Sequence, residues 1–77
     1  MLGFPTRAQV ESIRAKYPEG TRVRMIRMGD DINPIPKGTV GTVRFVDDAG
    51  SVHMAWDNGR TLAFIPGEDV VEIVKEG

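Results

Sequence analysis

The stretch that decides the fold is Ser51–Ile65, SVHMAWDNGRTLAFI, in which two short apolar runs flank a DNGR turn. Asn-Gly between two such runs is a strong hairpin signal, because both central residues of a type I′ turn need a positive φ. We therefore place Asn58 and Gly59 at the centre of the turn. This register pairs His53 with Phe64 across the hairpin.

Both faces of this hairpin carry apolar side chains. The first face carries Val52, Met54, Trp56, Ala63 and Ile65, and the second carries His53, Ala55, Leu62 and Phe64. A hairpin with one solvated face alternates apolar with polar residues, so this one needs cover on both sides. We expect the sheet to fold over and bury the first face, and another element to cover the second.

A short amphipathic helix precedes the strands. Thr6 and Gln9 form a capping box, and the pattern predicts a helix from about Arg7 to Lys16 that stops before Pro18. Its apolar stripe consists of Val10, Ile13 and Tyr17.

Three helical turns are too few to be stable alone in water, so this helix must pack on something. The predicted acceptor is the face formed by Ala55, Leu62 and Phe64, with Leu2 and Phe4 extending the patch. The alternative is a frayed helix that binds a partner.

From residue 20 the apolar period becomes that of strands. The predicted strands are residues 21–28, residues 38–46, the two arms of the hairpin, and residues 70–74. Val23 and Met25 share one face of the first strand, and the break in alternation at the Met25-Ile26 step indicates a bulge or a strong bend. Gly41 inside the second strand indicates a bend or a close backbone approach.

These elements predict a mainly β fold, a small SH3-like barrel of five strands with an N-terminal helix. Residues 1–19 hold the helical segment and residues 20–77 the barrel, within a single domain overall. The first face of the hairpin would form the core together with Val23, Met25, Val43 and one side of residues 70–74. An open antiparallel sheet with the helix on one face is the alternative.

Composition places the chain among small globular domains. Its 77 residues are 40% hydrophobic and 27% charged, with no cysteine, which excludes a disulfide framework and a thiolate metal site. No apolar run approaches the roughly 18 residues of a membrane span, and the first residues do not read as a signal peptide. We expect a soluble cytoplasmic protein with no membrane partner.

Several motifs carry a resemblance to a known family. The runs YPEGTRVRMIRM and GTVGTVRFVDDAGSVHMAWDNGRTLAFIPGED resemble the small bacterial and phage domain-of-unknown-function family 4314, over about Tyr17 to Ile73. More distantly, GTVGTV followed by WDNG is similar to SH3-like modules of the Mib/Herc2 type. The first resemblance implies an SH3-like fold and no established activity, and the second implies a role in protein interaction.

No constellation for catalysis or metal binding is evident. His53 is the single histidine and lies in mid-strand, where a packing residue is the more common role than a general base. The pairs Asp30-Asp31 and Asp47-Asp48 lack the spacing of a calcium loop and are expected to be solvated turn residues. We expect a non-catalytic protein without a metal or cofactor.

The first candidate binding surface takes a protein or peptide segment. It lies between the loop at residues 29–37 and the hairpin turn, and consists of Ile32, Pro34, Ile35, Pro36, Asp57, Asn58 and Arg60. The alternative is that Ile32 and Ile35 simply fill the end of the core.

The second candidate surface takes nucleic acid. It consists of Arg22, Arg24, Arg27 and Arg44, with Lys37 nearby. Residues 1–46 hold eight basic and four acidic residues, and residues 47–77 hold two and seven, an asymmetry that fits such a partner. The alternative is that these arginines pair with Asp47, Asp48 or Glu72.

Overall fold

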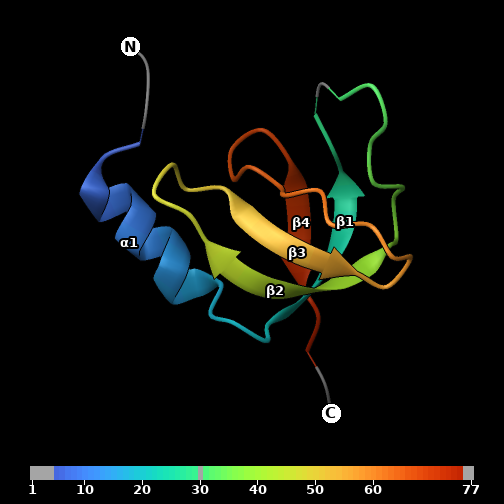
Figure 1. Cartoon of the computed structure of the whole chain (residues 1–77), viewed down its shortest axis with the longest axis horizontal. Coiled ribbons are helices and arrows are strands. Elements are labelled where there is room, and N and C mark those ends of the chain that lie inside the picture. Colours follow the sequence, from blue (N-terminus) through green and yellow to red (C-terminus); the bar gives the residue numbers. More distant parts are fainter. Residues whose placement is uncertain (1–4, 30, 76–77) are drawn as a thin grey trace.

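A four-stranded antiparallel sheet with one helix beside it makes up the fold (Figure 1). The computed structural model describes residues 5–29 and 31–75. The elements are α1 (Arg7–Lys16), β1 (Arg22–Arg27), β2 (Val40–Val46), β3 (Val52–Trp56) and β4 (Val70–Ile73). The strand order is β3-β2-β1-β4, an open sheet. The prediction of a five-stranded closed barrel was therefore wrong in strand number and in closure, and the alternative of an open antiparallel sheet is confirmed.

The helix has the predicted bounds and the predicted cap. The Thr6 hydroxyl accepts the Gln9 backbone N–H at 3.1 Å, and the Gln9 side chain accepts the Thr6 backbone N–H at 2.7 Å. At the other end the Tyr17 N–H donates to the carbonyl of Ile13 at 2.9 Å, and Pro18 follows. Two N-terminal donors that a helix leaves without partners are thus satisfied within the first turn.

The helix packs against β2 and the turn that leads into β3, not against the predicted face. A Cβ atom built on Gly50 in that turn would lie 3.2 Å from Cδ1 of Ile13 and 3.8 Å from Cγ2 of Val10. Of the predicted acceptor residues, Phe64 contacts Tyr17 just beyond the helix, with ring centroids 5.3 Å apart at 83°. Leu2 and Phe4 lie outside the described residues.

The register of the central hairpin explains this difference. Trp56 and Arg60 pair across a loop of three residues: the Trp56 N–H donates to the carbonyl of Arg60, and the Gly59 N–H to that of Trp56, both at 2.9 Å. Gly59 has a φ of +91°, and no described non-glycine residue has a positive φ, so Asn58 does not occupy a type I′ position. A three-residue loop with glycine in the left-handed region is the other common hairpin connection.

This loop shifts the pairing by one residue and turns the second arm over. Val52, not His53, pairs with Phe64 through two hydrogen bonds of 2.9 and 3.0 Å. Phe64 is fully buried in the core, and Ile65 is 43% exposed. A slip of one residue moves every side chain to the opposite face. The second apolar face predicted for the hairpin therefore does not exist, and it needs no helix to cover it.

The core lies on one face of the sheet and draws on most of the chain. Its buried members are Tyr17, Val23, Met25, Ile35, Val43, Val46, Val52, Met54, Trp56 and Phe64. The predicted contributions of the first three strands are confirmed, whereas Ile65 was placed wrongly in the core. Val71 of β4 packs against the core as a partly buried residue.

Two irregularities bend the sheet. The pairing of β1 with β4 shifts register between Met25 and Arg27, which confirms the predicted bulge. A second shift between Val43 and Phe45, in the pairing of β2 with β3, was not predicted. It leaves Arg44 and Phe45 both exposed, where strict alternation would bury one of them.

The two edges of the sheet differ. Residues 60–64 run along β3 and bond to it at Val52 and Trp56. At the other edge, the described part of the chain places no strand beyond β4. Across the described residues, no helix has the length and apolar character needed to cross a membrane.

Candidate functional site

The loop after β1 is fastened to the hairpin by Arg60. Its guanidinium donates to the backbone carbonyl of Asn33 at 2.6 Å and to that of Pro34 at 3.1 Å. The next residue, Ile35, is 2% exposed and belongs to the core. The predicted proximity of loop and turn is thus confirmed, and the contact rests on carbonyl groups that sequence patterns do not reveal.

The residues predicted for the peptide site separate into three environments. Ile32 is fully exposed and Ile35 is buried, so the alternative in which both fill the core holds for Ile35 alone. Pro34, Pro36 and Asn58 are exposed. Asp57 is exposed as well, and Arg22 of β1 binds its carboxylate. We name the loop of residues 31–36 and the turn of residues 57–60 together the loop–turn surface.

Half of the predicted basic face is neutralised by carboxylates. Arg22 donates to both Asp57 oxygens at 2.9 and 2.8 Å, and this hydrogen bonding lowers the pKa of Asp57. Arg24 binds Glu72 at 2.6 Å, which confirms the predicted pairing with Glu72. Two of the four arginines therefore carry compensated charges.

The other two arginines, Arg27 and Arg44, are exposed. Within residues 5–29 and 31–75, neither forms an ion pair. They lie on different strands, and Asp47 and Asp48, the acids predicted to neutralise them, bind His53 and Arg14 instead. The structure does not gather the four arginines into one uncompensated patch.

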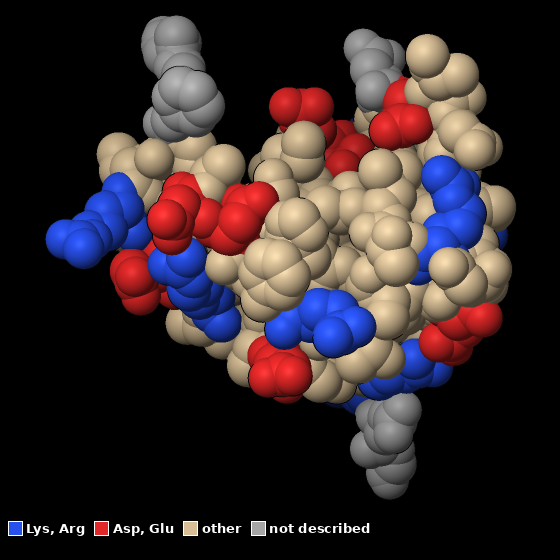
Figure 2. Space-filling model, viewed as in Figure 1, with Lys and Arg blue, Asp and Glu red and all other residues tan. Residues whose placement is uncertain are grey.

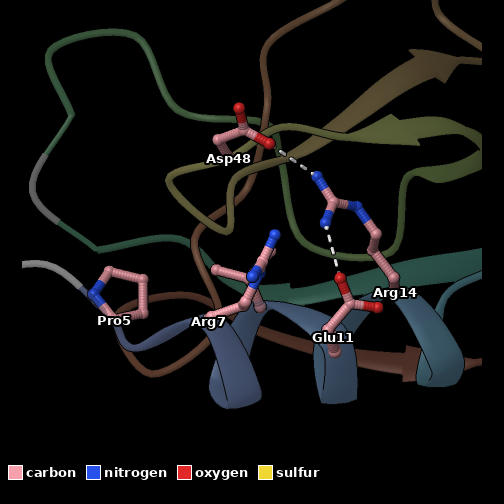
Figure 3. Close-up of a pocket in the computed structure, with 6 residues that line it drawn as sticks. Pro5, Arg7, Glu11, Arg14 and Asp48 are labelled. Atoms are coloured by element: carbon pink, nitrogen blue, oxygen red, sulfur yellow. Dashed lines mark hydrogen bonds and ion pairs between the residues drawn. The ribbon is translucent and has the colours of Figure 1, made fainter.

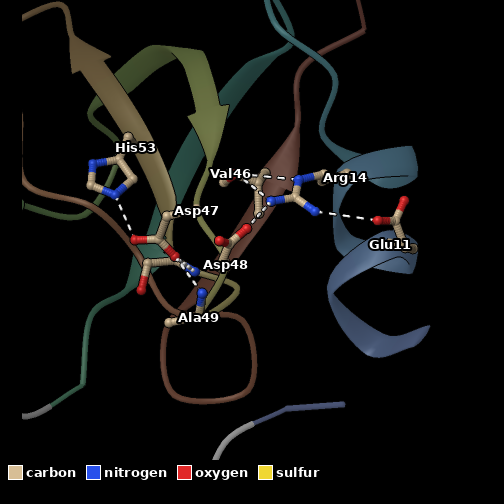
Figure 4. A network of polar contacts seen from close by, with 8 residues as sticks. Glu11, Arg14, Val46, Asp47, Asp48, Ala49 and His53 are labelled. Carbon is tan, nitrogen blue, oxygen red and sulfur yellow. Dashed lines mark hydrogen bonds and ion pairs between the residues drawn. The ribbon is translucent and has the colours of Figure 1, made fainter. Parts of the chain in front are cut away.

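His53 is held by a hydrogen bond to Asp47 (Figure 4) and by a ring that stacks on it. Its Nε2 lies 2.8 Å from Oδ2 of Asp47, and its ring stacks on that of Phe45 with centroids 4.3 Å apart. The other Asp47 oxygen accepts the N–H groups of Ala49 and Ser51 at 3.0 Å each. The hydrogen bond from His53, followed by those two, lowers the pKa of Asp47 against the opposing effect of burial. The predicted partner of His53, Phe64, was wrong because of the register shift.

A polar cavity of about 370 Å³ lies between the start of the helix and the turn after β2 (Figure 3). It is lined by Pro5, Arg7, Val10, Glu11, Arg14 and Asp48. Arg14 spans it, bound to Glu11 at 3.3 Å and to Asp48 at 3.0 Å. Its charges are largely compensated, and in the described ranges no three His, Cys, Asp or Glu side chains are placed to hold a metal ion.

A second cavity, of about 240 Å³, joins the loop after β1 to the segment before β4. It is lined by Met28, Asp31, Ser51, Leu62, Ala63, Ile65, Glu68 and Asp69, and we name it the acidic groove. Asp69 holds its two sides together, because one oxygen accepts the Gly29 N–H at 2.6 Å and the other the Ile65 N–H at 2.8 Å.

Sequence reasoning missed the acidic groove. The usable signal was the run of acids in IPGED directly after an apolar stretch. It could be interpreted only once the one-residue shift had turned Ile65 outward.

Comparison with protein families identifies this chain. The family described as "Domain of unknown function (DUF4314)" matches residues 6–74, so the chain belongs to this family. This confirms the resemblance seen in the GTVGTV, WDNGR and IPGED motifs. The comparisons with curated proteins and with solved structures each found no match.

Proposed function

We propose that this member of the family is a non-catalytic interaction domain that binds a protein or peptide segment through the loop–turn surface. The proposal rests on the exposure of Ile32. Its side chain is fully exposed, although Arg60 holds the loop at the next residue, Asn33. Burying an aliphatic side chain of this size against a partner contributes about 1.5–3 kcal/mol. A folded chain gains nothing of that kind from leaving it in water.

The anchoring of the loop supports this proposal. Arg60 binds two consecutive carbonyl groups of the loop, and the Ile35 side chain is buried. The prolines on either side of Ile35 restrict the backbone there. A surface that is already ordered loses less conformational entropy when a partner binds. The relationship to SH3-like domains, which bind peptides beside a comparable loop, remains part of the proposal.

The compensated charges favour this proposal over nucleic-acid binding. Affinity for a phosphate backbone comes from cationic side chains that replace condensed counterions. Arg22 and Arg24 already have carboxylate partners, and the net charge of the chain is −1. Arg27 and Arg44 would have to supply the affinity from separate strands.

Selection from a random peptide library against the immobilised chain tests the peptide proposal. Peptides enriched on the wild-type chain should bind at least about tenfold more weakly to Ile32→Ser, since the loss of one buried aliphatic contact is worth that factor. The matched control is Ile73→Ser, which removes a 40% exposed isoleucine from β4. Enriched peptides that bind both variants as tightly as wild type would refute the role of the loop.

A mobility-shift assay addresses the alternative. Wild-type chain and the double variant Arg27→Gln, Arg44→Gln are titrated into duplex DNA and single-stranded RNA at low salt. The peptide proposal predicts no retarded band for either chain. A band that disappears steeply with salt and is lost in the double variant would establish the nucleic-acid function instead.

A further inference from the structure

We propose that the acidic groove is a docking site for an extended peptide segment in which lysine or arginine flanks an aliphatic side chain. This site goes beyond the loop–turn surface, because only Asp31 belongs to both, and its other lining residues are Met28, Ser51, Leu62, Ala63, Ile65, Glu68 and Asp69. Ile32 and Arg60 are not among them. Three features of the groove favour such a segment: its size, its apolar floor and its charge.

The floor of the groove is apolar and open. Leu62 and Met28 pack against the core from its edge, and Ile65 stays 43% exposed beside them. At about 240 Å³ the groove lies below the roughly 300–1,000 Å³ of sites that enclose a cofactor or drug-sized ligand. It has room for one aliphatic side chain of a longer segment.

The charge at the rim of the groove determines which residues can flank that aliphatic side chain in the bound peptide. Three of the eight lining residues are acidic, Asp31, Glu68 and Asp69, and none is basic. In the described part of the chain none of these three carboxylates forms an ion pair with lysine or arginine. Acidic side chains also gather over these two loops in Figure 2, along the upper edge of the molecule. An apolar floor with an anionic rim complements an apolar residue between cationic ones.

The groove is also held in shape before any partner binds. Asp69 accepts N–H groups from Gly29 on one side and Ile65 on the other, and the Asp31 side chain accepts the Asn33 N–H at 2.9 Å. Asp69 is therefore held from both sides of the groove, and Asp31 is exposed and bonded within its own loop. Glu68 is exposed and is free to meet the incoming cation.

Two blocked pentapeptides, acetyl-GKLKG-amide and acetyl-GELEG-amide, test the site by NMR on the whole ¹⁵N-labelled chain. The Lys peptide should shift the amides of residues 62–65 and 68 in a saturable way, at least about threefold more tightly than the Glu peptide. Glu68→Gln should weaken the Lys peptide by about two- to fivefold, and Ala63→Leu should weaken it further by filling the floor. Glu72→Gln, which removes an acid from β4 outside the groove, should leave binding unchanged.

Three results would overturn the site. Equal binding of both peptides, or no saturable shift at the groove amides, would remove the proposed ligand. Shifts that depend on protein concentration in the absence of peptide would assign the groove to a second copy of this chain. Ile32→Ser should leave Lys-peptide binding unchanged, so failure of this site and failure of the loop–turn surface are separate outcomes.

Discussion

At the scale of single residues, the packing is tightest where the backbone of Gly41 meets the indole ring of Trp56. Gly41 lies opposite Trp56 in the β2–β3 pairing, and a Cβ atom at Gly41 would approach Cε3 of the indole to 2.6 Å. The indole cannot move away freely, because its N–H donates to the carbonyl of Leu62 at 2.8 Å. This contact fixes the ring between the sheet and the returning segment.

Gly41→Ala should therefore lower the free energy of unfolding by about 1–3 kcal/mol, as overpacking does. Urea denaturation of Gly41→Ala, Trp56→Leu and the double variant measures the coupling. The cost of the alanine should shrink in the Trp56→Leu background, because the atom it strikes is gone. Equal costs in both backgrounds would place the strain elsewhere.

Asp47 should give the domain an acid-sensitive turn. Hydrogen bonds from His53, Ser51 and Ala49 lower the pKa of Asp47, so the unfolded chain takes up a proton more readily than the folded one. Its contribution is complete above the ordinary carboxyl value of about 3.8 and is lost as pH falls through the lowered value. Asp57, whose pKa is lowered by Arg22, acts in the same direction.

Denaturation of wild type and Asp47→Asn at neutral pH and near pH 3 tests this. The asparagine keeps an oxygen for the turn amides and loses the charge, so the variant should lose less stability on acidification than wild type. Curves that fall in parallel would show that Asp47 contributes nothing to the acid response.

At the scale of elements, the hairpin shows which features the sequence predicts and which it does not: the position of the turn was predicted correctly, and its type was not. The WDNGR signal located the turn, and the capping box at Thr6 located the helix to the residue. The turn type remained open, since Asn-Gly also fits a three-residue loop with one left-handed glycine. Choosing the shorter loop moved the second arm by one residue and placed Phe64 and Ile65 on the wrong faces.

Alanine at each of these two neighbours tests the register. Phe64→Ala should cost about 3–5 kcal/mol, because the ring is fully buried and edges onto Tyr17. Ile65→Ala should cost less than about 1 kcal/mol, since that side chain is largely at the surface. Thermal or chemical denaturation compares the loss of stability in the two variants. A larger loss for Ile65→Ala would support the two-residue turn and its register instead.

For the molecule as a whole, the core is assembled from the loop after β1 as well as from the strands. Ile35 fills it although the surrounding residues GDDINPIPK show no strand or helix period. Periodicity therefore predicted most strand members of the core and left the loop's contribution undecided. Periodicity did not predict the acidic groove for the same reason, because the groove lies between two segments without regular secondary structure.

Two isoleucines of this loop separate stability from binding. Ile35→Ala should lower the unfolding free energy by about 2–5 kcal/mol, whereas Ile32→Ala should change it by no more than about 0.5 kcal/mol. Ile35 is 2% exposed and Ile32 is fully exposed. Melting curves of the two variants decide the matter. A strongly destabilised Ile32→Ala would mean that Ile32 serves the fold.

The outer position of β4 has a consequence for how concentrated solutions of this protein behave. An uncovered strand offers its backbone to any neighbouring chain, which is the first step toward fibrils. Here that strand is four residues long and carries Glu72, and Lys75 lies two residues beyond its end. The short length of the strand and these charges oppose such stacking. Replacing Glu72 and Lys75 with threonine should therefore cause concentrated solutions of the protein to aggregate into a gel.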